Sequence, residues 1–195
     1  TEDFGLLSFF AIVRRGAALP LLETVVHPLK PVFASDARVL ILGTMPSPKS
    51  REVRFYYGHP QNRFWRVMTA VLGEPALPLT NADKAAMMQR HRIALWDVLH
   101  SCKIAGASDA SIREPVANPI AGLIQCTAIR TVFTTGKRAH SLYEKLVYPE
   151  TGLHATALPS TSPANCRISL QELVAAYQCV RDASERPGFG QGHSY

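Results

Sequence analysis

The sequence predicts a three-layer α/β/α fold, in which a short, mostly parallel four-stranded sheet lies between two layers of helices. Two observations predict it. Short runs of apolar residues alternate with stretches of helical periodicity, and turn residues separate the two kinds of segment. No internal repeat or linker divides the chain, so its 195 residues are expected to form one main domain.

The expected strands are continuous apolar runs, which are typical of parallel strands buried on both faces. The helices between them carry apolar residues at helical spacing and end at turn residues such as Gly73. In order, the expected strands span Arg38–Leu42, Ile93–Leu99, Ile129–Phe133 and His154–Leu158. The expected helices span Arg63–Leu72, Ala82–His91, Pro119–Gln125, Gly136–Val147 and Ile168–Arg181. The polar stretch Ser101–Asn118 is expected to be a long irregular loop.

The two ends of the chain differ from the middle. Residues 1–26 are expected to be an N-terminal extension of unknown role, residues 27–182 the domain, and residues 183–195 a flexible tail rich in Gly, Ser and Pro. The apolar stretch Gly5–Val13 is short, and acidic residues precede it where a secretory signal would have basic ones. No run reaches the ~18–20 apolar residues of a spanning helix. We therefore expect a monomer in the cytoplasm without membrane contact, associated with the nucleoid in a bacterium.

Charge indicates the kind of partner. The net charge is +6, and five basic side chains lie close together in sequence at Lys49, Arg51, Arg54, Arg63 and Arg66. This clustering favours a nucleic-acid partner. The four cysteines form no C-x-x-C pair, the histidines show no metal spacing, and the chain has no phosphate-binding loop. The sequence therefore predicts free thiols and neither a metal nor a cofactor.

Two loops of unusual composition follow predicted strands. The first, within Gly43–Trp65, joins a buried strand to a helix through about twenty residues, whereas ordinary connections take about 4–6. It contains paired tyrosines, a histidine and an asparagine. The second, Leu158–Asn165, reads LPSTSPAN. Because ligands bind beyond the carboxyl ends of parallel strands, we expect both loops on the same rim of the sheet.

The pairing of these loops resembles the uracil-DNA glycosylase superfamily, over roughly residues 27–182. FYYGHPQNRFW is similar to the mismatch-specific uracil/thymine branch, but that branch has an asparagine where this chain has Met45. Met45, together with LILGTMPSPKSRE and LPSTSPAN, resembles the hypoxanthine-DNA glycosylase family, which acts on deoxyinosine. The resemblance implies a monofunctional enzyme of base-excision repair that flips a deaminated base out of the helix and hydrolyses its N-glycosidic bond.

The resemblance also implies roles for individual residues. Asn62 would be catalytic, orienting water or donating a hydrogen bond to the base, and Tyr57 would stack on the flipped base. With Tyr57, the expected base pocket comprises Gly43, Thr44, Met45, Pro46, Ser47 and His59. The expected DNA contacts are Lys49, Ser50, Ser160, Ser162, Pro163, Ala164 and Asn165. Ala164 is smaller than the leucine that usually fills the vacated stack.

Structural explanations compete with several of these roles. Asn62 occupies an N-cap position, Tyr56 could exchange roles with Tyr57, and the Ser and Pro of the second loop suit an ordinary turn. Asp97, at a predicted strand end, could hold a histidine or an arginine, or cap the following turn. Arg63 and Arg66 are expected on the exposed face of their helix, where they could bind phosphate.

The sequence thus predicts a DNA glycosylase, with hypoxanthine as the preferred base. One alternative is an enzyme for uracil, or for thymine mispaired with guanine. Another is a DNA-binding relative without activity, which Met45 favours and Asn62 disfavours.

Overall fold

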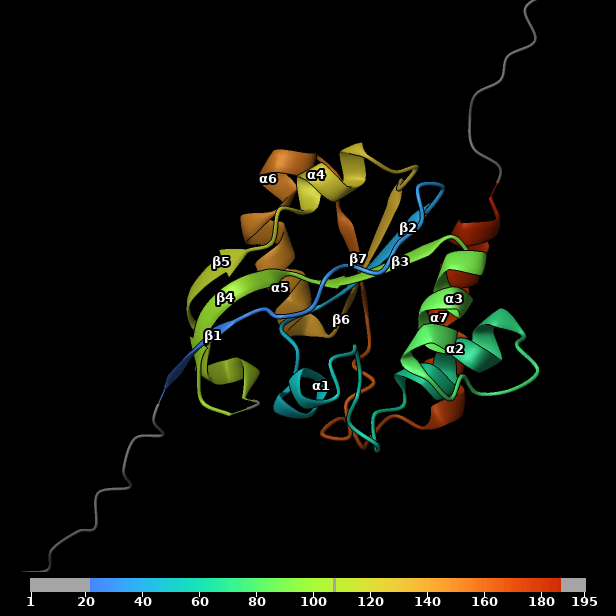
Figure 1. The fold of residues 1–195 in the computed structure, drawn as a ribbon, viewed down its shortest axis with the longest axis horizontal. Coiled ribbons are helices and arrows are strands. Elements are labelled where there is room, and N and C mark those ends of the chain that lie inside the picture. Colours follow the sequence, from blue (N-terminus) through green and yellow to red (C-terminus); the bar gives the residue numbers. More distant parts are fainter. Residues whose placement is uncertain (1–21, 107, 187–195) are drawn as a thin grey trace, which may run out of the picture.

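A computed structural model describes residues 22–106 and 108–186, so expectations for residues 1–21 and 187–195 lie outside the described residues. The main sheet has four parallel strands, as predicted, and their order is β3-β2-β6-β7 (Figure 1). Its strands are β2 (Val39–Gly43), β3 (Ile93–Asp97), β6 (Thr131–Thr135) and β7 (Ala155–Leu158). Their register places Gly43 beside Asp97 and Thr134 beside Leu42, so the carboxyl ends of the strands lie together.

Helices cover both faces of this sheet and confirm the three-layer architecture (Figure 1). One layer consists of α2 (Phe64–Leu72), α3 (Asn81–Arg90) and α7 (Leu170–Glu185). The other consists of α4 (Ile120–Gln125), α5 (Lys137–Leu146) and the unpredicted α6 (Tyr148–Thr151). Ser169 begins α7 with a capping box, and this helix continues three residues into the segment expected to be a tail.

A second sheet corrects the expectation for the middle of the chain. The predicted loop Ser101–Asn118 contains most of β4 (Leu99–Ile104), a 3-10 turn η1 (Asp109–Ser111) and β5 (Arg113–Ala117). Together with β1 (Glu23–Val26), which lies within the segment assigned to the extension, they form an antiparallel sheet in the order β1-β4-β5. The edge strand β5 includes Pro115 and buries none of its residues, so its composition resembles that of a loop.

The chain passes between the two sheets at Val98. The run Ile93–Leu99, predicted as one strand, ends in the parallel sheet at Asp97 and enters the antiparallel sheet at Leu99. The Val98 amide bonds to the Gly43 carbonyl, and Asn118 Nδ2 donates to the carbonyls of Asp97 and Leu99, each at 2.9 Å. The backbone on either side of Asp97 is therefore fixed by hydrogen bonds.

The long segment after β2 is also more regular than predicted. It contains a short helix, α1 (Pro48–Glu52), where we expected only loop. The Ser47 side chain caps α1 by accepting from the Ser50 amide, and Pro48 occupies the first turn, where a missing N–H costs nothing. All four cysteines are free, and among the described residues no helix is long and apolar enough to cross a membrane.

Candidate active site

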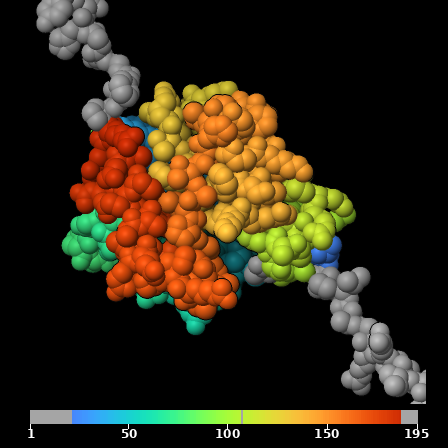
Figure 2. Space-filling model, turned by 180° about the vertical axis from the view of Figure 1, so that it is seen from behind, coloured from blue at the N-terminus to red at the C-terminus, as the bar shows by residue number. Residues whose placement is uncertain are grey.

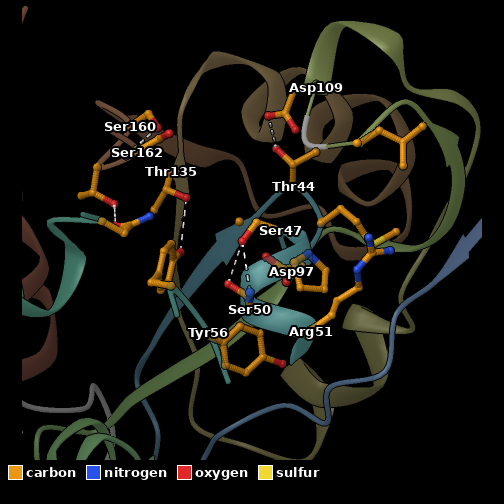
Figure 3. Close-up of a pocket in the computed structure, with 18 residues that line it drawn as sticks. Thr44, Ser47, Ser50, Arg51, Tyr56, Asp97, Asp109, Thr135, Ser160 and Ser162 are labelled. Atoms are coloured by element: carbon orange, nitrogen blue, oxygen red, sulfur yellow. Dashed lines mark hydrogen bonds between the residues drawn. The ribbon is translucent and has the colours of Figure 1, made fainter. Parts of the chain in front are cut away.

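A pocket of about 180 Å³ lies at the carboxyl edge of the parallel sheet (Figure 3). It is lined by the last residues of β2, β3 and β6, which are Gly43, Asp97 and Thr135, and by the loop that follows β7. Its lining combines both of the unusual loops, which therefore share a rim as expected. The surface seen from behind shows the teal segment that follows β2 recessed between the orange loop after β7 and the lime segment around η1 (Figure 2). The lining residues that carry polar groups are Thr44, Ser47, Ser50, Arg51, Tyr56, Tyr57, Asn62, Asp97, Asp109, Thr135, Ser160, Thr161 and Ser162.

The predicted pocket residues Gly43 to Ser47 all line this pocket, as does Tyr57. His59 is not among the lining residues. Its ring Nδ1 accepts from the Gln61 amide at 3.2 Å, and its carbonyl accepts from the Asn62 amide at 2.8 Å. His59 thus shapes the turn that presents Asn62.

The Tyr57 ring is held in place by a second aromatic ring behind it. One face of its ring stacks on Phe64, with ring centroids 3.7 Å apart and an interplanar angle of 11°. Its hydroxyl is 3.3 Å from the Thr135 hydroxyl at the end of β6. Burial raises the pKa of the Tyr57 phenol well above its usual value, and the Asp97 charge adds to this, so the ring stays neutral. The ring is therefore a rigid neutral surface with only one face left for a ligand.

Tyr57 also has a backbone φ of 52°, in the left-handed region that non-glycine residues seldom adopt. Such conformations cost about 1–3 kcal/mol and persist where surrounding contacts impose them, often at functional sites. Its neighbour Tyr56 is buried, and its hydroxyl donates to the Lys30 carbonyl at 2.8 Å. The two tyrosines are therefore not equivalent, since the contacts of Tyr56 hold the turn that follows β1.

The Asn62 side chain has a fixed orientation. Its Oδ1 accepts from the Phe64 amide at 3.0 Å and from the Thr161 hydroxyl at 2.9 Å. Because a backbone N–H can only donate, the oxygen end of the amide is identified by its partner. Nδ2 is then the free end, and among the described residues it has no hydrogen-bond partner. Asn62 is not the N-cap residue that the sequence suggested, because α2 starts one residue later and Arg63 takes that position. The bonds of Oδ1 and any pocket chemistry of Nδ2 are compatible, because they use opposite ends of one amide.

Arg63 lies differently from its prediction. It is the N-cap residue of α2 and is half-buried, and its guanidinium reaches the loop after β7. Nη1 donates to the Ile168 carbonyl, and Nη2 donates to the Asn165 carbonyl at 2.7 Å. The Arg63 amide also donates to the Thr161 carbonyl at 3.1 Å. Arg63 therefore joins the two loops of the site, whereas Arg66 is exposed as predicted.

We expect Arg63→Ala to lower the free energy of unfolding by about 2–3 kcal/mol, because hydrogen bonds to charged groups contribute about 1.5–3 kcal/mol each and the carbonyls stay partly buried. Arg66→Ala is the matched control, with an expected change within about 0.5 kcal/mol. Urea unfolding of both variants measures the difference. Equal stabilities would show that the guanidinium does not hold the two loops together.

The loop after β7 is held by short internal contacts. The Ser160 hydroxyl accepts from the Ser162 amide at 3.2 Å, and Asn165 Nδ2 donates to the Ser160 carbonyl at 2.8 Å. The Tyr177 hydroxyl of α7 bonds the Pro159 carbonyl at 2.8 Å. Ala164 is exposed at the turn. Of the predicted DNA-contact residues, only Ser50, Ser160 and Ser162 also line the pocket, and Lys49 pairs instead with Glu52 at 2.7 Å.

The pocket has a carboxylate at its floor that local sequence patterns do not identify as a ligand group. Asp97, 5% exposed, accepts from His27 Nε2 at 2.9 Å through Oδ2. Oδ1 has no partner among the described residues and lies over Gly43, where a Cβ would come within 2.2 Å of it. Glycine at position 43 thus makes room for this oxygen. Of the alternatives for Asp97, the structure selects a partner histidine, which is 70 residues away in sequence.

A second carboxylate faces the pocket from η1. Asp109 Oδ2 accepts from the Thr44 hydroxyl at 3.1 Å. Burial of the carboxyl group raises its pKa and the Asp97 charge raises it further, while Thr44 and Arg138 lower it. A carboxyl whose pKa is raised on folding binds its proton more tightly in the native state, so stability is lost as the pH rises through that pKa.

Asp109→Asn should remove the loss of stability at high pH, because asparagine does not ionise, and its amide oxygen can still accept from the Thr44 hydroxyl. We expect the variant to be the more stable protein at pH 8, with an advantage over the wild type that shrinks as the pH falls to about 4, the ordinary pKa of an aspartate. Urea unfolding at both pH values measures it. A pH-independent difference between the two proteins would contradict a raised pKa for the Asp109 carboxyl.

The fold is that of an α/β protein with a pocket, lined in part by the Tyr57 ring, at the carboxyl edge of its parallel sheet. The sequence model of the uracil DNA glycosylase superfamily matches residues 31–180. This chain therefore belongs to the uracil DNA glycosylase superfamily, and the predicted class, a DNA N-glycosylase, is confirmed.

Individual relatives agree with the family assignment. Two proteins described as hypoxanthine DNA glycosylases, from Methanosarcina acetivorans and Methanosarcina barkeri, are 33% and 31% identical to this chain. The matches cover 71% and 70% of this chain and 87% and 86% of the relatives. The solution NMR structure of a candidate uracil DNA glycosylase from Methanosarcina acetivorans superposes with a TM-score of 0.68 at 29% identity. It covers 81% of this chain and 99% of its own.

Proposed function

We propose that this protein excises deaminated bases from DNA, with hypoxanthine from deoxyinosine as the preferred substrate. One observation carries the proposal: the pocket floor presents a hydrogen-bond acceptor, Asp97 Oδ1, with no partner among the described residues. Deamination changes a ring nitrogen that accepts a hydrogen bond into an N–H that donates one. A carboxylate at the floor therefore favours the deaminated base over its parent.

The depth of the pocket supports this use of Asp97. Gly43 and Asp97 are buried, while Ser47, Ser160 and Ser162 are half-exposed around the opening. A flipped nucleotide keeps its sugar and phosphates near the backbone, so its base enters with the pairing edge first. In hypoxanthine that edge carries the N1–H and the C6 carbonyl, and it would reach the pocket floor.

Tyr57 would hold the base by stacking on its free face, since Phe64 covers the other. Such stacking contributes about 1–3 kcal/mol per base. Met45 lines the same pocket and offers apolar contact without a polar group. Aromatic and apolar walls exclude water, which strengthens the few hydrogen bonds that orient the base.

Asn62 would serve catalysis as a donor. Breaking the N-glycosidic bond leaves negative charge on the departing base, and a fixed donor stabilises that charge. The orientation of the amide supports this role over the alternative in which its oxygen orients water, because Oδ1 already accepts two hydrogen bonds. Water would be the nucleophile, with no metal or other cofactor.

The remaining proposed residues contact the DNA backbone around the flipped nucleotide. Ser160 and Ser162 would bind phosphates through hydroxyl and amide groups, and Lys49 would add positive charge. Pro163, Ala164 and Asn165 would fill the space that the base leaves. The Ser50 hydroxyl accepts from the Gly58 amide at 3.0 Å, so its part would be to shape the pocket opening. We propose that the protein acts as a monomer on chromosomal DNA. In a bacterial cell this DNA is the nucleoid.

Uracil is the second candidate base. Uracil also presents an N–H beside a carbonyl, so the Asp97 carboxylate can accept a hydrogen bond from it. The name of the superfamily and the description of the solved relative both mention uracil. The described names of the two Methanosarcina relatives favour hypoxanthine.

The test is a glycosylase assay on labelled duplexes with one deoxyinosine, one deoxyuridine or one G·T mismatch, followed by alkali. Strand scission at deoxyinosine is expected to be the fastest. Scission only at uracil or mismatched thymine would replace the proposed substrate. Binding without scission on all three duplexes would identify a DNA-binding relative that has lost its chemistry.

A further inference from the structure

His27 is a buried histidine outside the pocket lining, and both of its ring nitrogens are engaged. The side chain is 1% exposed and follows directly after β1, whose pairing with β4 is extended by a bond from the His27 amide to the His100 carbonyl at 2.6 Å. The antiparallel sheet thus places this imidazole next to Asp97, on the side of the carboxylate that faces away from the pocket. No part of the proposed reaction uses it.

The hydrogen bonds determine which nitrogen carries the proton. The Leu29 amide donates to Nδ1 at 3.2 Å, and a backbone N–H can only donate, so Nδ1 is the bare nitrogen. Nε2 then carries the proton in the neutral ring and donates to Asp97 Oδ2 at 2.9 Å. A second proton on Nδ1 would face the Leu29 N–H. These two hydrogen bonds therefore select one tautomer of the ring, with the proton on Nε2.

The His27 imidazole has a specific effect on Asp97. Its single ring N–H satisfies one carboxylate oxygen and leaves the other without a partner among the described residues. It also fixes which oxygen faces the ligand, because Oδ2 is engaged and Oδ1 lies over Gly43. Tyr56 packs beside the imidazole, with ring centroids 6.3 Å apart, and limits its movement.

We propose that His27 is a positioning residue for base recognition, which holds the Asp97 carboxylate turned so that Oδ1 accepts the ring N–H of the flipped base. The inference rests on the proposed function. It implies that the accessory β1-β4-β5 sheet sets the base preference of the pocket through this one hydrogen bond. His27 touches no substrate atom in this role.

The first test compares His27→Phe with His27→Gln. Phenylalanine fills the space without a donor, whereas the glutamine amide can still donate to Asp97. In single-turnover assays on the deoxyinosine duplex we expect His27→Phe to release base at least tenfold more slowly, and His27→Gln to recover most of the rate. We also expect His27→Phe to lower the preference for hypoxanthine over adenine. Equal rates and equal preference in His27→Phe and the wild type would overturn the proposal.

A double-mutant cycle with Asp97→Ala separates positioning from a general effect on folding. If His27 acts through Asp97, then adding His27→Phe to Asp97→Ala slows base release little further. Independent multiplicative losses would overturn the proposal.

The ring itself gives a readout that needs no activity. Nitrogen-15 NMR of the wild-type imidazole should show the proton on Nε2 and a bare Nδ1, and the opposite tautomer would overturn the proposal even if His27→Phe fails to fold. Wild-type protein that releases none of the deaminated bases would instead refute the proposed function, whatever the tautomer of His27.

Discussion

Replacing Asn62 with aspartate is expected to slow base release by about 100- to 1,000-fold, the usual cost of removing one donor that stabilises developing charge. Aspartate keeps the oxygen that accepts from Phe64 and Thr161, so the start of α2 and the loop after β7 keep these hydrogen bonds. What changes is the end of the side chain that faces the pocket, where a donor becomes a negative oxygen. Single-turnover kinetics on a deoxyinosine duplex measures the loss.

Asn62→Ala completes this comparison. It removes the donor together with the oxygen that accepts from Phe64 and Thr161, so we expect a similar kinetic loss and an additional loss of about 1 kcal/mol of stability. Fluorescence anisotropy should show nearly unchanged DNA affinity for this variant. Gln178→Glu, at an exposed position of α7, is the control for adding one negative charge. If the Asn62→Asp variant released base at a rate within tenfold of the wild type, the side-chain oxygen and not the nitrogen would be the atom that serves catalysis.

Asp97→Asn is expected to have the second largest effect on the rate of base release. It should also change the preference of the enzyme for hypoxanthine over adenine. His27 Nε2–H would bond the oxygen of the new amide, so its NH₂ group would point into the pocket. The floor then presents a hydrogen-bond donor in place of an acceptor. This donor cannot bond to the N1–H of hypoxanthine, but it can donate to the unprotonated N1 of adenine. Loss of a hydrogen bond to a charged group costs about 1.5–3 kcal/mol, or roughly 10- to 100-fold in rate.

The measurement is base release from matched duplexes that carry deoxyinosine or deoxyadenosine at one position. We expect the hypoxanthine rate to fall and the preference over adenine to shrink. Asp109→Asn provides the matched control, because it makes the same chemical change at the other carboxylate of the pocket. An equal effect of both substitutions on selectivity would mean that pocket charge, and not the position of Asp97, determines which base is excised.

The parallel sheet could be predicted because its strands are recognisable one at a time. Each is a short apolar run, and β2 is buried at every residue. The antiparallel sheet could not, because β5 is exposed and polar and exists only by pairing with β4, which in turn pairs with residues at the start of the domain. Edge strands of this kind have little local signal.

The candidate site divides in the same way. Motifs identified the loops that contain Asn62 and Tyr57, and these side chains do line the pocket. Arg63 was placed by helical periodicity, but it precedes the helix as its N-cap residue, where that periodicity does not apply. The pairing of His27 with Asp97 spans two sheets, and no spacing in the sequence marks residues that meet only when both sheets have formed.

The bond from Thr161 to Asn62 makes the orientation of one side chain depend on a distant part of the fold. The two residues are 99 positions apart, and the loop that contains Thr161 is held by Tyr177 of α7. A chain in which α7 has not yet docked already contains the asparagine, the two tyrosines and the floor carboxylate, but the Thr161 loop then lacks its bond to Tyr177. We therefore expect the Asn62 amide to take its final orientation only after α7 has docked.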